Sequence, residues 1–241
     1  MDSNNKKIIV ITGGGTSEKI DDVRRITNSS TGRLSKDIAE AFLQSEDVGK
    51  VYLLLGKHAV RPDEGYFGSR LKIIDIEDTN DLLESLRILL SRNQADVIIH
   101  AMAVSDYTVK SVMSVNELVD TVNARKALPS TQSESKISSN LENPVILLKK
   151  TPKVISYLRA FAPDACIVGF KLLSHVENAE LVDVARKLLI RNDLDFVLAN
   201  DARDIAGDIH LGYLVAKEDV REIYQTKQMI AHGLVTRTLC S

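Results

Sequence analysis

Short apolar segments alternate with amphipathic ones along most of the chain, and this alternation limits the possible folds more than any other feature of the sequence. The apolar segments, which predict β-strands, are 7–12, 50–55, 71–76, 96–103, 165–171 and 195–199. Between them, the segments that carry apolar residues at helical spacing are 34–44, 79–92 and 177–192. The alternation favours an α/β fold of the Rossmann-like type, with a mostly parallel sheet and helices on both faces.

Two segments depart from this alternation. Residues 212–225 predict a C-terminal antiparallel hairpin, with a terminal helix at about 226–239. Residues 129–143 are polar, rich in serine and poor in apolar side chains, so we expect a mobile flap there. No repeat and no linker interrupts the pattern, and residues 1–241 are therefore predicted to form a single domain.

The connection after the first predicted strand is unusually long and polar. Strand Ile8–Ile11 leads into Thr12-Gly13-Gly14-Gly15, then into a charged segment, 18–25, and then into Asn28-Ser29-Ser30-Thr31-Gly32 before the first predicted helix. Glycines let backbone N–H groups approach a phosphate, and a helix N-terminus adds unpaired N–H groups and partial positive charge. The sequence therefore predicts a nucleotide site of unusual layout; the alternative is a glycine-rich turn that binds no ligand.

The common nucleotide-binding motifs do not fit this connection. A dinucleotide fingerprint needs a third glycine where Glu18 stands, and the second predicted strand ends at Gly56-Lys57 rather than at an acid for the ribose. No glycine has the partners of a Walker loop, and Tyr107 lacks the lysine four residues later that short-chain dehydrogenases use. An NAD(P)-dependent reductase is thus a disfavoured alternative.

Composition excludes several other classes. Lysine and arginine number 31 against 33 aspartates and glutamates, and only 5% of residues are aromatic, so we expect no nucleic acid partner. No apolar run reaches the roughly 18 residues of a membrane span, and the N-terminus is not typical of a signal peptide. Because Cys166 and Cys240 form no disulfide framework, we expect a cytoplasmic protein. The histidines lack zinc-ligand spacing, which favours activation of a substrate by a nucleotide over hydrolysis by a bound metal.

The connection also carries a family resemblance. Gly14-Gly15-Thr16, followed by Ile20-Asp21-x-Val23-Arg24-x-Ile26-Thr27-Asn28-x-Ser30-Thr31-Gly32, resembles phosphopantothenate–cysteine ligase, the phosphopantothenoylcysteine synthetase of coenzyme A biosynthesis. Further similar segments, among them 100–107, extend the resemblance over nearly the whole chain. It implies a ligase that joins 4'-phosphopantothenate to L-cysteine, with CTP (or alternatively ATP) as co-substrate and Mg²⁺. It also implies a free-standing form without the decarboxylase domain, and a homodimer with shared active sites.

The resemblance implies a reaction in two steps. The carboxylate of 4'-phosphopantothenate attacks the α-phosphate and releases pyrophosphate, and the amine of cysteine then attacks the acyl nucleotide and releases the nucleoside monophosphate. By resemblance, Gly14, Ser30 and Gly32 would bind the triphosphate, and Asn28 would hold the acyl nucleotide. Arg24 would reach a substrate group, in related enzymes from the neighbouring subunit.

The remaining site residues implied by the resemblance lie at predicted strand ends or in the flap. Ala103 would line the phosphopantothenate site, and Asp106 would hold the substrate or a divalent metal, or else cap a turn. Phe170 would pack on the base, or else belong to the core, and Asn200 would bond to the base or sugar. Lys136 would neutralise charge on the α-phosphate, although a lysine in a serine-rich loop is ordinarily solvated.

The chain departs from the family pattern at two positions near the predicted site. Met102 stands where the family usually has a small residue and Ser35 where it often has a glycine, so the pocket wall and a backbone contact are expected to differ. Thr151 is predicted to cap a helix that has Pro152 at its first position. A non-catalytic module that binds a nucleotide without turning it over is the second alternative function.

Overall fold

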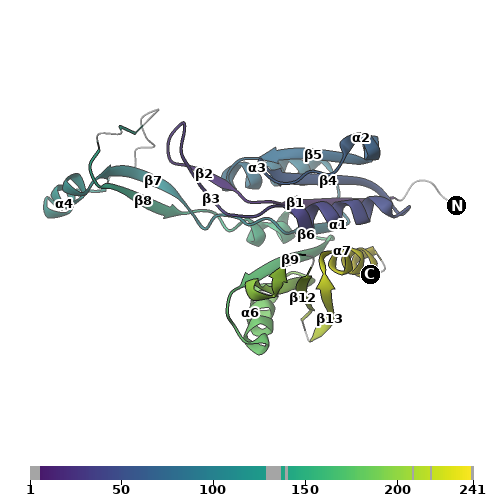
Figure 1. Ribbon diagram of the computed structural model, residues 1–241. Coiled ribbons are helices and arrows are strands. Elements are labelled where there is room, and N and C mark those ends of the chain that lie inside the picture. The colour runs from purple at the N-terminus through teal and green to yellow at the C-terminus, as the bar shows by residue number, and fades with distance from the viewer. Residues whose placement is uncertain (1–5, 129–136, 139–140, 208, 218, 240–241) are drawn as a thin grey trace.

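The structure is a computed structural model that describes residues 6–128, 137–138, 141–207, 209–217 and 219–239 (Figure 1). Its central sheet consists of β1 (Lys7–Gly13), β4 (Val48–Gly56), β5 (Leu71–Ile76), β6 (Val97–His100), β9 (Cys166–Leu173), β10 (Phe196–Asp201), β11 (Ile205–Ala206), β12 (Ile209–Val215) and β13 (Val220–Thr226).

The strand order confirms the predicted Rossmann-like fold. Strands β5-β4-β1-β6-β9-β10 lie side by side and are all parallel, and β12 follows them antiparallel, paired in turn with β11 and β13. The order reverses between β1 and β6, which is the switch point beside which ligands bind at the carboxyl ends of strands in doubly wound sheets.

Helices cover both faces of this sheet. The longer helices are α1 (Arg33–Gln44), α3 (Thr79–Arg92), α6 (Asn178–Arg191) and α7 (Lys227–Leu239), and the short helices are α5 (Leu158–Phe161) and α2 (Glu64–Phe67), the latter beside β5. Ile9 and Ile11 of β1 belong to the apolar core that includes α1 and α7, whereas Val10 belongs to the core that includes α3, α5 and α6. This alternation follows from the two-residue period of a strand. None of the described helices is both long and apolar enough to cross a membrane.

The predicted helices 34–44, 79–92 and 177–192 are observed as α1, α3 and α6, each within one residue of the predicted bounds. The predicted strand 96–103 is wrong over its last three residues. After His100 the chain leaves the regular strand and runs along the glycine turn, where Ala103 N donates to Gly14 O at 2.8 Å. The helix predicted from Thr151 and Pro152 is also wrong, because the first helical turn there is 3₁₀ and begins at Val154.

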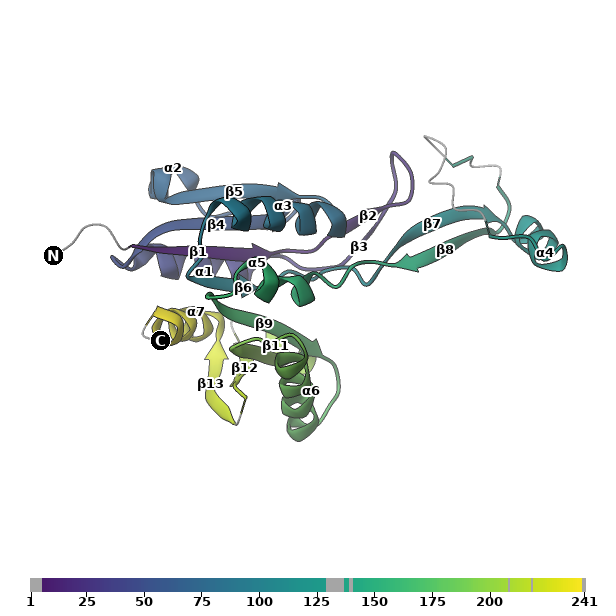
Figure 2. The same ribbon diagram turned by 180° about the vertical axis from the view of Figure 1, so that it is seen from behind.

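An arm that the sequence patterns did not predict projects from the central sheet. Strands β7 (Tyr107–Ser114) and β8 (Pro144–Lys150) pair antiparallel, and α4 (Val115–Asn123) begins at the outer end of β7 with a capping box between Ser114 and Glu117. In both views the ribbon and α4 project away from the central sheet (Figures 1 and 2). The expected flap, 129–143, lies largely outside the described residues.

The polar connection forms a second, smaller projection. Strands β2 (Ser17–Lys19) and β3 (Arg25–Thr27) pair as a hairpin that extends toward the same end of the molecule as the arm (Figure 2). The buried carboxylate of Glu18 accepts hydrogen bonds from the backbone N (3.0 Å) and Oγ1 (2.7 Å) of Thr79 at the start of α3. Glu18, which breaks the dinucleotide fingerprint, therefore anchors the hairpin to the start of α3.

Candidate nucleotide site

A cavity of about 560 Å³ lies at the carboxyl ends of the parallel strands. Its walls come from the turn after β1, the start of α1, the segment after β6, strands β9 and β10, and the β11–β12 turn. Six of the ten residues predicted to form the site line it, namely Gly14, Ser30, Gly32, Ala103, Phe170 and Asn200. The fold thus brings residues that are far apart in the sequence to one cavity at the switch point.

The turn after β1 and the start of α1 form a backbone surface suited to an anion. Gly14 and Gly32 have positive φ angles of 75° and 71°, and a Cβ at either would lie 2.8 Å and 2.6 Å, respectively, from Cβ of Ala59. Helix α1 has no side-chain cap from its N-cap residue and no acidic residue in its first turn. The N–H of Arg33 donates to Oγ1 of Thr31 at 3.4 Å, and the next N–H groups of this turn remain available to a ligand. We call Gly14, Ser30, Gly32 and these N–H groups the cradle.

The side chain of Ser35 hydrogen-bonds the backbone of the cradle from its buried side. Its buried hydroxyl donates to the carbonyl oxygen of Gly32 at 2.8 Å and occupies the space beside Gly13 that a side chain there would need. The departure at Ser35 therefore adds a bond beneath the cradle. Met102 is buried in the core and also contributes to the cavity wall, so the larger side chain there is accommodated largely by the interior.

Asn28 lies beside the cavity and is held by a chain of hydroxyl groups. Oγ of Ser105 donates to Oδ1 of Asn28 at 3.1 Å, and Oγ1 of Thr16 donates to Oγ of Ser105 at 3.1 Å. The backbone N of Ser105 donates in turn to Thr16 Oγ1 at 2.8 Å. Oδ1 of Asn28 is occupied as an acceptor, and no described residue accepts from its amide N–H groups. Sequence analysis missed Ser105 and Thr16, since no local motif marks them.

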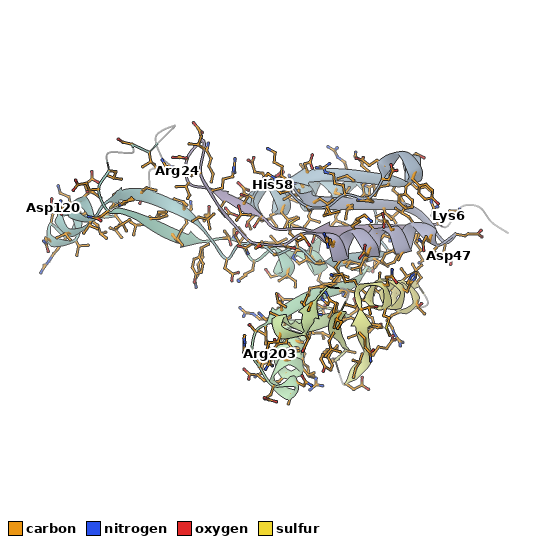
Figure 3. All side chains as sticks on the ribbon, in the orientation of Figure 1. Lys6, Arg24, Asp47, His58, Asp120 and Arg203 are labelled. Carbon is orange, nitrogen blue, oxygen red and sulfur yellow. The ribbon has the colours of Figure 1, made fainter. Side chains whose placement is uncertain are left out.

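Arg24 does not line the cavity of its own chain. Its Nε donates to Oδ2 of buried Asp21 at 3.0 Å, and its Nη2 donates to the carbonyl oxygen of Ile137 at 2.8 Å. Figure 3 places Arg24 on the β2–β3 hairpin, away from the central sheet. Burial alone would raise the pKa of Asp21, but hydrogen bonds from the amides of Ile137, Val23 and Arg24 and from the Arg24 guanidinium hold this pKa well below its usual range. The predicted role of Arg24 at a neighbouring subunit's site stays a prediction.

Asp106 also does not line the cavity. The exposed carboxylate of Asp106 forms an ion pair with Lys153, and Lys136 falls outside the described residues. Within the described ranges, no three His, Cys, Asp or Glu side chains lie close enough together to hold a metal ion. One exposed carboxylate that is already paired with an ammonium group does not fit a resident metal site, and the metal role of Asp106 stays a prediction.

The wall opposite the cradle combines an aromatic ring with polar side chains. Phe170 and Leu172 come from β9, and the buried Asn200 from β10. Nδ2 of Asn200 donates to the carbonyl oxygen of Leu211 at 3.0 Å, which fixes the side chain against β12. His210 and Lys227 line the same end of the cavity, and sequence analysis did not select either residue.

A larger open depression, of about 1040 Å³, lies at the amino ends of the strands. It contains none of the predicted site residues, and several of its charges pair with one another: Lys7 with Asp96 at 3.0 Å and Arg159 with Asp195 at 2.8 Å. Since ligands of parallel sheets bind at the carboxyl ends, we assign the functional site to the smaller cavity.

Comparisons with known proteins identify the family of this chain. The family model for the DNA/pantothenate metabolism flavoprotein C-terminal domain matches residues 4–116 and 127–239. The coenzyme A biosynthesis bifunctional protein CoaBC of Methanocaldococcus jannaschii is 28% identical over 232 residues, which cover 95% of this chain and 49% of that protein. The chain therefore spans about half the length of the curated relatives it matches.

Two solved structures extend the comparison. The DNA/pantothenate metabolism flavoprotein from Streptococcus pneumoniae is 39% identical with a TM-score of 0.86, and the alignment covers 98% of this chain and 99% of that chain. A Cab2 variant in complex with phosphopantothenate-cysteine shares the fold, with a TM-score of 0.71 at 18% identity over 98% of this chain and 88% of that chain. Because the family model matches almost the whole chain, the family resemblance is confirmed: this protein belongs to the family of DNA/pantothenate metabolism flavoprotein C-terminal domains.

Proposed function

We propose that this protein is a ligase of coenzyme A biosynthesis that joins 4'-phosphopantothenate to L-cysteine through an acyl nucleotide. The observation that carries the proposal is the cavity at the switch point, where the uncapped start of α1 and the glycines of the cradle face Phe170 and Asn200. An anion cradle at one end and an aromatic and amide wall at the other suit the phosphates and the base of one nucleotide. The coenzyme A biosynthesis names of the relatives agree with this substrate class.

The first step forms a bond between a carboxylate oxygen of 4'-phosphopantothenate and the α-phosphorus, and it breaks the bond from that phosphorus to the pyrophosphate leaving group. Negative charge builds on the phosphoryl oxygens as this happens. The N–H groups of the cradle, fixed by the positive φ angles of Gly14 and Gly32, would stabilise that charge without rearrangement. Mg²⁺ would enter with the triphosphate as part of the co-substrate, which is CTP or alternatively ATP.

The second step forms the amide. The cysteine nitrogen, after losing a proton, attacks the acyl carbon, and the nucleoside monophosphate leaves with the former carboxylate oxygen. Asn28 accepts a hydrogen bond from Ser105 and lies two residues before Ser30 of the cradle, and its amide N–H groups would hold the acyl nucleotide for this attack. The enzyme's contribution is therefore positioning and anion stabilisation.

We further propose that the active protein is a homodimer whose sites are shared. In this arrangement Arg24, held at the hairpin by Asp21, would complete the cavity of the neighbouring subunit. Val23, beside Arg24 on the same hairpin, is 69% exposed in the single chain and would be covered by the second copy.

Pyrophosphate release tests the proposed function. Purified protein is incubated with 4'-phosphopantothenate and each of the four nucleoside triphosphates, with and without cysteine. We expect pyrophosphate with at least one triphosphate, dependence on 4'-phosphopantothenate, and amide product only when cysteine is present. Nucleotide binding without pyrophosphate would support the non-catalytic module instead, and binding of NAD(P) but not of triphosphates would support the reductase.

A further inference from the structure

A histidine that the proposed chemistry does not use lies at the end of the cavity opposite the cradle. His210, on β12, lines the cavity, and only 8% of its surface is exposed. Its Nδ1 is fully buried and has no hydrogen-bond partner among the described residues. Buried polar atoms are nearly always paired in folded proteins, so the described residues leave the ring of His210 with unused hydrogen-bonding capacity beside the cavity.

The surroundings of His210 keep its ring neutral. Burial is the main cause of its lowered pKa, and the nearby ammonium group of Lys227 lowers it further, to about 4. Lys227 is itself held in place, because its Nζ donates to the carbonyl oxygen of Gly207 at 2.9 Å. A neutral imidazole offers one N–H donor and one acceptor, which suits recognition of a polar but uncharged group.

The order of the strands indicates which part of a nucleotide would reach His210. From the cradle at β1, the carboxyl edge runs through β6, β9 and β10 to β12. Those four intervals span about 19 Å at the usual spacing of roughly 4.8 Å between strands. Phosphates held at the cradle would therefore direct the base toward Phe170, Asn200 and His210.

Asn200 supplies a second group for the same purpose. Its Nδ2 is used by the carbonyl oxygen of Leu211, and its Oδ1 accepts from no described residue. We propose that His210 is a specificity-determining residue, whose ring acts with Oδ1 of Asn200 to hydrogen-bond the polar edge of the nucleobase. This inference rests on the proposed nucleotide site and adds the group that distinguishes one base from another.

Binding measurements can separate base recognition from phosphate recognition. Calorimetry would give the affinity of each of the four nucleoside triphosphates, and of inorganic tripolyphosphate, for wild type and for His210→Phe, which keeps a ring of similar shape. We expect the variant to bind the preferred triphosphate at least tenfold more weakly, to discriminate less among the four bases, and to bind tripolyphosphate as wild type does. His232→Phe, at an exposed position on α7, is the matched control and should bind like wild type.

Two results would overturn the inference. One is unchanged discrimination among the bases, and the other is an equal loss of affinity for triphosphates and tripolyphosphate, which would mean a disturbed cradle. If His210→Phe does not fold, the same affinities are measured for His210→Gln, which keeps a donor and an acceptor. An unchanged order of preference among the four bases, with unchanged ratios between their affinities, would count against the inference. Wild type that binds nucleotides but fails to discriminate refutes base recognition alone, whereas wild type that binds neither nucleotides nor tripolyphosphate refutes the proposed function as well.

Discussion

The buried side chain of His100 links two strands beneath the candidate site. It is the last residue of β6, and its Nδ1 shares a hydrogen bond of 2.8 Å with Oγ1 of Thr12, in the neighbouring strand β1. The bond crosses the switch point directly beneath the turn that carries Gly14. Burial lowers the pKa of His100 to about 4, so the ring is neutral at physiological pH.

This lowered pKa predicts a loss of stability in acid. Between pH 6.5 and pH 4 the unfolded chain binds a proton at His100 that the folded protein excludes, so the free energy of unfolding falls as the pH falls through this window. The shift corresponds to roughly 3 kcal/mol for this group at the acid end. Urea unfolding at pH 7.5 and pH 4.5 checks it: the difference between the two values should be smaller in His100→Asn than in wild type, and an equal difference would contradict the assignment.

The variant Gly32→Ala tests whether the cradle binds the nucleotide. Gly32→Ala places a Cβ against Ala59 and forces a positive φ on a side-chain-bearing residue, so we expect at least tenfold weaker nucleotide binding. Gly68→Ala is the matched control, because Gly68 also has a positive φ but has open space where a Cβ would lie and is not in the cavity wall. Both variants should lose at least about 1 kcal/mol of stability from backbone strain, and Gly32→Ala should lose more because its Cβ also meets Ala59. Equal nucleotide affinity in the two variants, measured by calorimetry, would remove Gly32 from the site.

Asn28→Asp tests the second step. The substitution keeps an oxygen that can accept from Ser105 but removes the amide N–H donors, so amide formation should slow by more than tenfold while pyrophosphate release slows less. Rapid-quench measurement of pyrophosphate and of the amide separates the two steps. An equal loss in both would contradict a role in holding the acyl nucleotide.

Local chemistry explains which site residues the sequence could predict. Gly14, Ser30 and Gly32 lie in a short segment whose glycines and small side chains themselves indicate an anion site, and they line the cavity as expected. His210 could not be selected in this way. It reaches the cavity only because β12 pairs antiparallel with β10, and a pairing between distant strands leaves no local signal at the histidine.

At the scale of elements, the arm shows where hydrophobic periodicity alone was not enough. Val109, Ser111 and Met113 alternate inward along β7, but the partner strand comes thirty or more residues later, after α4 and a polar segment. Neither a tight turn nor a helical crossover links the two strands, so the rules that identified the central sheet did not apply. The central strands were predictable because each is a continuous apolar run buried on both faces.

We expect the arm to open locally without unfolding the central sheet. Helix α4 begins with a capping box in which Oγ of Ser114 accepts from the backbone N of Glu117 at 3.1 Å. Ser114→Ala removes that cap and should cost about 1 kcal/mol in the local opening of α4. Hydrogen exchange should show faster exchange in α4 amides, with β1 and β6 unchanged; protection lost across the central sheet would mean that the arm and sheet unfold together.

For the whole molecule, the proposed homodimer makes a quantitative prediction. Light scattering should give a mass near twice 26.6 kDa. Two variants, Arg24→Ala and Asn28→Asp, are then mixed after unfolding and refolding together. If each site takes Arg24 from the partner, a mixed dimer contains one intact site, and the mixture should recover roughly a quarter of wild-type activity. A monomer at full activity, or a mixture no more active than its components, would rule out shared sites.

In the proposed reaction, the carboxylate of 4'-phosphopantothenate is activated by transfer of a nucleotidyl group at the cradle. A heavy oxygen isotope placed in that carboxylate can be followed through one turnover by mass spectrometry of the products. We expect one labelled oxygen in the nucleoside monophosphate and none in pyrophosphate. Label in inorganic phosphate, with release of a nucleoside diphosphate, would contradict it, because the attack would then have occurred at the γ-phosphate.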